Sequence, residues 1–100
     1  MRLRILPSAF GDLDGGRAFY AQHGEELGDY FLDSLFADID SLPLYAGIHI
    51  QIWGFHRMLS RRFPYAIYYK VEDDVCTVWR VLDCRRRPSR VRQALRGSRP

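Results

Sequence analysis

The sequence predicts an α+β domain: an N-terminal strand and a two-helix hairpin packed on a mostly antiparallel sheet of about four strands. Two observations predict it. Apolar residues recur at helical spacing up to residue 42, and from residue 48 they recur at every second position. The length of 100 residues, with 47% hydrophobic and 27% charged residues, is typical of one globular domain. We expect its core over about 1–88 and a basic tail over 89–100.

The first elements are predicted to be a short strand and a helix. "RLRIL" at 2–6 alternates polar and apolar residues, as a strand does. Ser8 is the expected N-cap of the helix that follows. Gly15 and Gly16 are expected to weaken this helix by about 1 kcal/mol each relative to Ala. "QHG" at 22–24 breaks the helical spacing and predicts a turn.

The second helix has the clearest pattern in the chain. Its apolar face is formed by residues at helical spacing: Leu27, Phe31, Leu35, Ile39 and Leu42. Asp33, Asp38 and Asp40 are expected on its solvent side, and Pro43 is expected to end it. The two helices and the turn between them therefore predict an αα-hairpin with a broad apolar stripe.

The second half of the chain is predicted to be a meander of strands. The alternating isoleucines of 48–52 and the segment "HRMLS" at 56–60 predict two of them. Alternation over 63–71 predicts a third, and "EDD" at 72–74 predicts the turn that follows. Residues 75–82 are apolar on both faces, which is typical of a buried last strand. The open face of this sheet, flanked by arginines, is the expected working surface.

Arg80 is the exception in that last strand. An unpaired charge in a buried strand is expensive, so the sequence predicts that Arg80 has either a partner or a groove. After the strand, "SRVRQAL" at 89–95 can form one short basic helix.

Charge is distributed unevenly along the chain. Residues 1–50 hold three arginines against eight acids, a net −5, and residues 51–100 hold eleven arginines and one lysine against four acids, a net +8. Such a basic half indicates a polyanionic partner, either nucleic acid or an acidic protein segment. The alternative, that the arginines only solvate the surface, is weaker for a whole half, because solvating surfaces usually mix both signs.

Several function classes lack support. No GxGxxG, GxxxxGK, GxSxG or HExxH pattern occurs, and the three histidines and two cysteines lack the spacing of a metal site, so we expect neither cofactor nor metal. No apolar run reaches the length of a membrane span, and no signal-peptide core is present. Cys76 and Cys84 are therefore expected to be reduced thiols in a cytoplasmic protein.

The candidate binding residues are arginines with aromatic residues between them: Arg57, Arg61, Arg62, Arg80, Arg85, Arg86 and Arg87. A guanidinium group binds phosphate through two hydrogen bonds, and aromatic rings stack on bases, so the combination suits RNA. The aromatic residues Phe63, Tyr65 and Tyr69 fit core packing at least as well.

Over most of its length the chain resembles the RelE/ParE superfamily, the toxins of bacterial type II toxin–antitoxin systems. The resemblance runs through "PSAFGDL", the helical hairpin "YAQHGEELGDYFLDSLFADIDSLP" and the strands. Its most specific part is "RRFPYAIYY" followed by "VLDCRRRP", close to the pattern of the ParE-like, plasmid-stabilisation branch. The resemblance implies a growth-inhibiting toxin that is neutralised by a cognate antitoxin with acidic and apolar segments.

Members similar to RelE cut mRNA on the ribosome as metal-free mRNA interferases, in which basic residues stabilise the developing charge. Arg57 and Arg85 match two of their basic positions. Leu59 and Ala66, however, stand where these nucleases carry a lysine and an arginine, and no Tyr or His follows residue 84. Members similar to ParE lack that set too, and inhibit DNA gyrase by binding.

The sequence therefore favours a gyrase inhibitor without chemistry of its own. The alternative is a metal-free, ribosome-dependent endoribonuclease with a rearranged set of arginines: Arg57, Arg61, Arg62, Arg80 and Arg85. A second alternative is a degenerate toxin that acts only as a binding partner.

Overall fold

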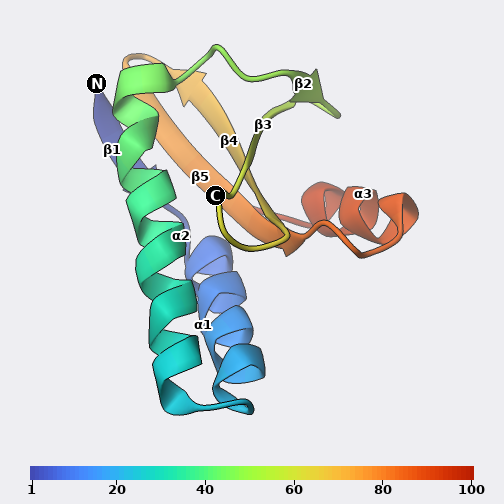
Figure 1. The fold of residues 1–100 in the computed structure, drawn as a ribbon. Helices are drawn as coiled ribbons and strands as arrows, with labels where there is room; N and C mark the ends of the chain where they lie inside the picture. The colour runs from blue at the N-terminus through green and yellow to red at the C-terminus, as the bar shows by residue number, and fades with distance from the viewer.

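A five-stranded sheet lies between two helical layers of unequal size (Figure 1). The structure is a computed structural model that describes residues 1–100. In chain order the elements are β1 (Arg2–Ile5), α1 (Pro7–Ala21), α2 (Glu25–Tyr45), β2 (Gln51–Ile52), β3 (Phe55–Leu59), β4 (Tyr65–Glu72), β5 (Val75–Asp83) and α3 (Pro88–Arg96). The strand order is β1-β5-β4-β3-β2, with β1 parallel to β5 and all other pairs antiparallel. The predicted α+β class is confirmed, and the N-terminal strand β1 joins the four strands of the meander by pairing with β5.

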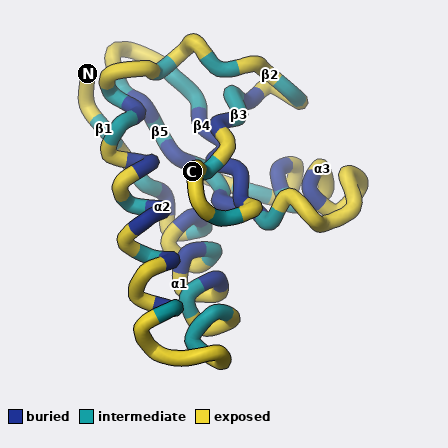
Figure 2. Tube along the Cα trace, viewed as in Figure 1, coloured by how far each residue is buried: buried dark blue, intermediate teal, exposed yellow.

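Each face of the sheet carries its own hydrophobic core. Alternate residues of β4 (Tyr65, Ile67 and Tyr69) belong to the larger core, which the α1–α2 hairpin covers. The residues between them, Ala66 and Tyr68, belong to a smaller core on the other face, which α3 covers. Figure 2 shows this in α3, where buried and exposed positions alternate along the helix. The second face, expected to be open, is thus partly closed by α3.

The two helices of the hairpin approach closely at glycines. A Cβ atom on Gly16 would lie 2.4 Å from Cζ of Phe31, and one on Gly28 would lie 2.9 Å from the Cβ of Ala21. Gly15 faces open space. The expectation that Gly15 and Gly16 act alike was therefore wrong, because only Gly16 makes room for a buried ring of the neighbouring helix.

The start of α1 completes the edge of β5 beyond the end of β1. Ser8 Oγ donates a hydrogen bond to the carbonyl of Trp79 (2.7 Å), and Asp12 Oδ2 accepts one from the backbone N–H of Val81 (2.9 Å). The N-cap residue is Leu6, and no side chain caps the helix. The prediction that Ser8 is the N-cap was wrong, since its hydroxyl pairs with the neighbouring strand instead.

Helix α2 buries the predicted apolar face but differs from the prediction at two residues. Asp38 was expected on the solvent side, but it is only 6% exposed. Its Oδ2 accepts hydrogen bonds from Ser60 Oγ (2.7 Å) and from the backbone N–H of Arg61 (3.2 Å), so it fixes the β3–β4 loop. Pro43 lies inside the helix, which ends at Tyr45. A proline this close to the end removes only one hydrogen bond of the helix.

The isoleucine segment forms less strand than its alternation predicts. Only Gln51–Ile52 is strand, and Ile48 and Ile50 are 74% and 69% exposed. The buried hydroxyl of Tyr69 determines the path of this loop: it accepts a hydrogen bond from the backbone N–H of Gly47 (3.0 Å) and lies 2.6 Å from His49 Nδ1.

A two-residue turn connects β2 to β3. Ile52 pairs with Phe55, and both residues of the turn have positive φ, 52° at Trp53 and 83° at Gly54. Asn-Gly is the favoured pair in such a turn, and a bulky residue at positive φ costs about 1–3 kcal/mol. Trp53 thus holds a strained position at the tip of the hairpin.

None of the helices in the molecule is long and apolar enough to cross a membrane.

Candidate functional site

The arginines that follow β5 surround an open hollow beside α3. The hollow has a volume of about 780 Å³, and four arginines line it: Arg85, Arg86, Arg87 and Arg90. We call these four residues the arginine corner. They meet because the chain turns sharply after β5 and at once starts α3, so residues from the loop and from the first helical turn lie side by side.

Arg85 is neutralised inside this corner. Its Nε and Nη2 donate to the two carboxylate oxygens of Asp83, at 2.9 and 2.7 Å, and its backbone N–H donates to the same carboxylate (2.8 Å). Hydrogen bonding to Arg85 holds the pKa of Asp83 below its usual value, and Asp83 raises the pKa of Arg85. Arg85 therefore closes the loop, and its guanidinium is already paired with Asp83 when a partner approaches.

The other three arginines of the corner are free. Arg86, Arg87 and Arg90 are exposed, and none of them forms an ion pair with a carboxylate of the chain. No acidic residue follows Asp83 that could neutralise them. Three unpaired guanidinium groups around one hollow can hold an anionic group by charge-assisted hydrogen bonds.

Arg57 reaches the same region from β3. Its Nε donates to the hydroxyl of Tyr68 (3.2 Å) and its Nη2 lies 3.7 Å from Cys84 Sγ. Arg57 and Arg86 line one small hollow of about 150 Å³. Tyr68 thus holds the guanidinium of Arg57 toward the start of the arginine corner.

Arg80 has a partner, as the sequence predicts, and is engaged by it. A shift of register between β4 and β5 pairs Tyr68 with Arg80 and Tyr69 with Val78. Arg80 Nε and Nη2 donate to both carboxylate oxygens of Asp12, at 2.7 and 2.8 Å. This pairing raises the pKa of Arg80.

The same guanidinium also reaches α3. Arg80 Nη1 donates to the carbonyl of Ala94 and to Ser98 Oγ, both at 3.2 Å. Arg80 therefore fastens α1 and α3 to β5 and is not available for a target.

Arg61 and Arg62 lie apart from the arginine corner, in the β3–β4 loop on the α2 side. The backbone of Arg61 is held by Asp38, and the guanidinium of Arg62 lies 5.8 Å from the ring centre of Tyr30. The seven arginines named from the sequence thus separate into groups. Arg57, Arg85, Arg86 and Arg87 come together, whereas Arg61, Arg62 and Arg80 do not join them.

Two histidines, seven residues apart, come together around Tyr69. His49 Nδ1 lies 2.6 Å from the Tyr69 hydroxyl, and the ring of His56 stacks on Tyr69 at 5.0 Å. Burial lowers the pKa of His49. No group of three or more His, Cys, Asp or Glu side chains could hold a metal ion.

Both cysteines are free thiols, one buried and one exposed. Burial raises the pKa of Cys76 to about 11, so its thiol stays protonated at neutral pH. Cys84 is exposed at the start of the arginine corner.

The sequence reasoning missed Arg90 and the two anchoring acids, Asp12 and Asp83. Arg90 stands three residues after Arg87, a helical spacing that could have joined it to the cluster. Asp12 gave no such signal, because it is 68 residues from Arg80.

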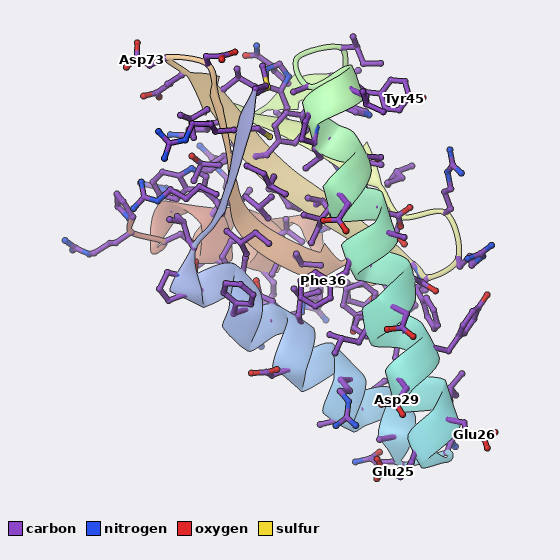
Figure 3. The ribbon with its side chains drawn as sticks, turned by 90° about the vertical axis from the view of Figure 1, so that its left-hand side faces the viewer. Glu25, Glu26, Asp29, Phe36, Tyr45 and Asp73 are labelled. Atoms are coloured by element: carbon purple, nitrogen blue, oxygen red, sulfur yellow. The ribbon has the colours of Figure 1, made fainter.

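Acidic side chains gather at the opposite end of the helical hairpin. Figure 3 shows Glu25, Glu26 and Asp29 beside the α1–α2 turn, where Arg17 pairs with Asp29 at 2.8 Å. These acidic residues thus lie away from the arginine corner, whereas Asp12 of the acidic half contacts the basic half directly through Arg80.

No family model matches the chain, and no curated protein matches it. Among solved structures it matches a chain of the chromosomal ParDE toxin–antitoxin system from P. aeruginosa, with a TM-score of 0.74 and 19% sequence identity. The match covers 81% of this chain and 92% of the other. The protein therefore shares the fold of that chain, in agreement with the fold that the sequence resemblance implied.

Proposed function

We propose that the protein is a ParE-like toxin of a type II toxin–antitoxin system, which inhibits DNA gyrase by binding and is neutralised by a cognate antitoxin. The observation that carries the proposal is the fold match to a ParDE chain, at a TM-score of 0.74 over 92% of that chain. The sequence block "RRFPYAIYY … VLDCRRRP" points to the same branch independently.

The arginine corner is the proposed contact with the target. Arg86, Arg87 and Arg90 are exposed and unpaired, so they meet an acidic surface without first losing a partner. Arg57 stands beside them, fixed by Tyr68. Charged groups arranged in this way increase the rate and the specificity of association with an oppositely charged partner.

The geometry supports the endoribonuclease alternative less well than it supports gyrase binding. Of the arginines it would use, Arg80 is paired with Asp12 and Arg85 with Asp83. Leu59 and Ala66 are cross-strand partners, so the two positions that carry basic residues in RelE-like nucleases form an apolar pair here. The nuclease stays an alternative that the experiment below separates from gyrase binding.

The antitoxin is proposed to carry an acidic stretch next to an apolar one. An acidic stretch suits the arginine corner. An apolar stretch suits the exposed apolar residues at the end of α2, in the loop before β2 and at the end of β3: Leu44, Ile48, Ile50 and Leu59.

A gyrase supercoiling assay with purified protein tests the proposal. The wild type is expected to inhibit supercoiling, and the double variant Arg86→Gln/Arg87→Gln is expected to need at least tenfold more protein for the same inhibition. Arg2→Gln/Arg4→Gln removes the same charge from exposed positions of β1 and serves as the matched control. Full supercoiling at an excess of wild-type protein would contradict the proposal.

Two further readouts separate the alternatives. Ribosome-dependent mRNA cuts that disappear in Arg85→Ala would favour the endoribonuclease. Normal growth of a host that lacks the antitoxin would favour a degenerate toxin that only binds.

A further inference from the structure

Trp53 is the residue whose position the fold explains least. It is strained at the tip of the β2–β3 hairpin with a φ of 52°, and with 37% of its surface exposed it is not fully buried. A strained residue that stays partly exposed is a reason to look for a function.

The indole faces a basic groove on α3. Trp53 lines a hollow of about 640 Å³ together with Arg92, Gln93 and Arg96, and the remaining lining comes from proline, serine and glycine. Arg92 and Arg96 are four residues apart on one flank of the helix, exposed, and not paired with any carboxylate of the chain. An aromatic side chain and two free guanidinium groups thus line the same hollow.

This groove continues into the arginine corner across α3. Gln93 lines both hollows, with Arg92 and Arg96 on one side of it and Arg87 and Arg90 on the other. In Figure 1, α3 projects from the end of the sheet away from the α1–α2 hairpin. The result is a track of positive charge with one aromatic platform at its end.

We propose that the groove formed by Trp53, Arg92 and Arg96 binds single-stranded nucleic acid. A base stacks on the indole of Trp53, and the flanking phosphates are bound by Arg92 and Arg96. Stacking requires an aromatic face that is open to solvent, and the backbone of the strand requires guanidinium groups beside it. A duplex keeps its bases stacked and offers none to the indole.

The lining of the groove favours nucleic acid over an acidic protein segment. Trp53 is the only hydrophobic residue among the seven that line the hollow. A protein segment gains most of its affinity from an apolar, desolvated centre, and the lining between Trp53, Arg92 and Arg96 offers no apolar side chain besides the indole. A base needs only the one ring.

This site goes beyond the gyrase-binding proposal. It adjoins the arginine corner through Gln93, but the residues assigned to it, Trp53, Arg92 and Arg96, are not among the four of the corner. Either proposal can fail while the other holds: supercoiling assays report on Arg86 and Arg87, whereas the titrations below report on Trp53, Arg92 and Arg96.

Fluorescence anisotropy with a fluorescein-labelled oligothymidylate tests it. Trp53→Asn is expected to weaken binding about tenfold, and Trp53→Tyr is expected to restore most of the affinity, because a tyrosine ring also stacks. Asn is favoured at this position of the turn, so Trp53→Asn should fold with an equal or higher Tm. Equal affinity of the wild type and Trp53→Asn would overturn the proposal.

The phosphate contacts have their own test. Arg92→Gln and Arg96→Gln are each expected to reduce the dependence of log K on log salt by about 0.7. Arg2→Gln/Arg4→Gln, on exposed positions of β1, is the control for lost charge alone. If Arg92→Gln/Arg96→Gln loses no more affinity than this control does, Arg92 and Arg96 do not bind the phosphates.

A direct spectroscopic signal is available from the indole. Trp79→Phe leaves Trp53 as the only tryptophan, and its fluorescence should be quenched over the same oligothymidylate concentrations as the anisotropy change. Poly-glutamate is the competitor that represents an acidic protein. If poly-glutamate displaces the oligothymidylate, and if the binding of poly-glutamate is itself lost in Trp53→Asn, the groove binds an acidic segment and the nucleic-acid proposal is wrong.

Discussion

Arg80 and Arg86 carry the same charge and stand six residues apart, yet the fold uses them in opposite ways. The side chain of Arg80 is 20% exposed and paired with Asp12, which is 12% exposed. Arg86 is exposed and lines hollows on both sides of the loop. A guanidinium withdrawn from water must be paired, whereas one left in water is free to meet a partner. The arginines useful for binding are therefore the ones without internal carboxylates.

Arg80→Gln is expected to destabilise the protein by about 3 kcal/mol, because it leaves Asp12 largely buried and unpaired. Asp12→Asn/Arg80→Gln should lose less than the two single variants added together, since the double variant leaves no uncompensated charge. Urea unfolding measures both. Arg4→Gln, at an exposed position, is the control and should change the free energy of unfolding by less than about 0.5 kcal/mol. If the loss in the double variant equals the sum of the losses in the two single variants, Asp12 and Arg80 do not stabilise each other.

The Asp83–Arg85 pair predicts a pH dependence. The folded pKa of Asp83 lies below its ordinary value of 3.8, so the pair stabilises the fold above pH 3.8 and loses this effect as the pH falls through the folded pKa. Arg85→Gln should therefore lower the free energy of unfolding by at most about 1 kcal/mol at neutral pH, because the side chain of Arg85 is largely exposed. Urea unfolding measured at pH values from 7 down to 2 should show that the difference in the free energy of unfolding between the wild type and Arg85→Gln becomes smaller as the pH falls. A difference that is constant with pH would contradict it.

At the scale of elements, small residues determine how closely two helices pack. Helix α1 carries two adjacent glycines with the same intrinsic cost, but Gly16 faces the ring of Phe31 and Gly15 faces solvent. Helix propensity treats them alike. The packing of α1 on α2 distinguishes them, because a side chain on Gly16 would occupy the space that the ring of Phe31 fills.

Gly16→Ala is therefore expected to destabilise the protein by about 1–3 kcal/mol, since its Cβ would lie 2.4 Å from Phe31 Cζ. Gly15→Ala, the matched control, meets nothing within 4 Å and should stabilise the protein by about 0.5–1 kcal/mol. Thermal unfolding followed by circular dichroism measures both variants. A stabilised Gly16→Ala would mean that the helices can move apart without cost.

At the scale of the whole molecule, α3 divides the functional surface from the core. Val91 and Leu95 are its two buried residues, and they cover the second face of the sheet. The arginines occupy the remaining sides of the same helix. Arg80 adds polar contacts that hold α3 from the other end. Docking of this one short helix therefore positions both basic hollows.

Leu95→Ser should loosen α3 while leaving the larger core intact. Trypsin is then expected to cleave after Arg92 and Arg96 on the order of tenfold faster, because local opening of α3 controls access to these bonds. Mass spectrometry of the fragments measures the rate. Leu44→Ser, at a position 80% exposed, is the control and should leave the rate unchanged. Unchanged protection in Leu95→Ser would mean that α3 is held by its polar contacts alone.

Local patterns were sufficient to predict the elements that bury one continuous face. The alternation over 63–71 predicted β4, and the helical spacing from Phe31 to Leu42 predicted the buried face of α2. Both patterns depend on neighbours along the chain, and a strand or helix converts such spacing directly into a face. The same reasoning failed at Ile48 and Ile50, where a hydrogen bond to Tyr69, from another strand, determines the path of the loop.

The sequence by itself determined the α+β class, the apolar faces of the main elements and the segregation of charge into two halves. Only the tertiary structure decided which arginines are free. Arg80 and Asp12 are 68 residues apart, and no sequence pattern predicts a pair over such a separation. Insertion of β1 beside β5 and docking of α3 on the second face likewise depend on contacts between distant segments. Pairing energies act through space, and the fold alone determines which charges come within reach.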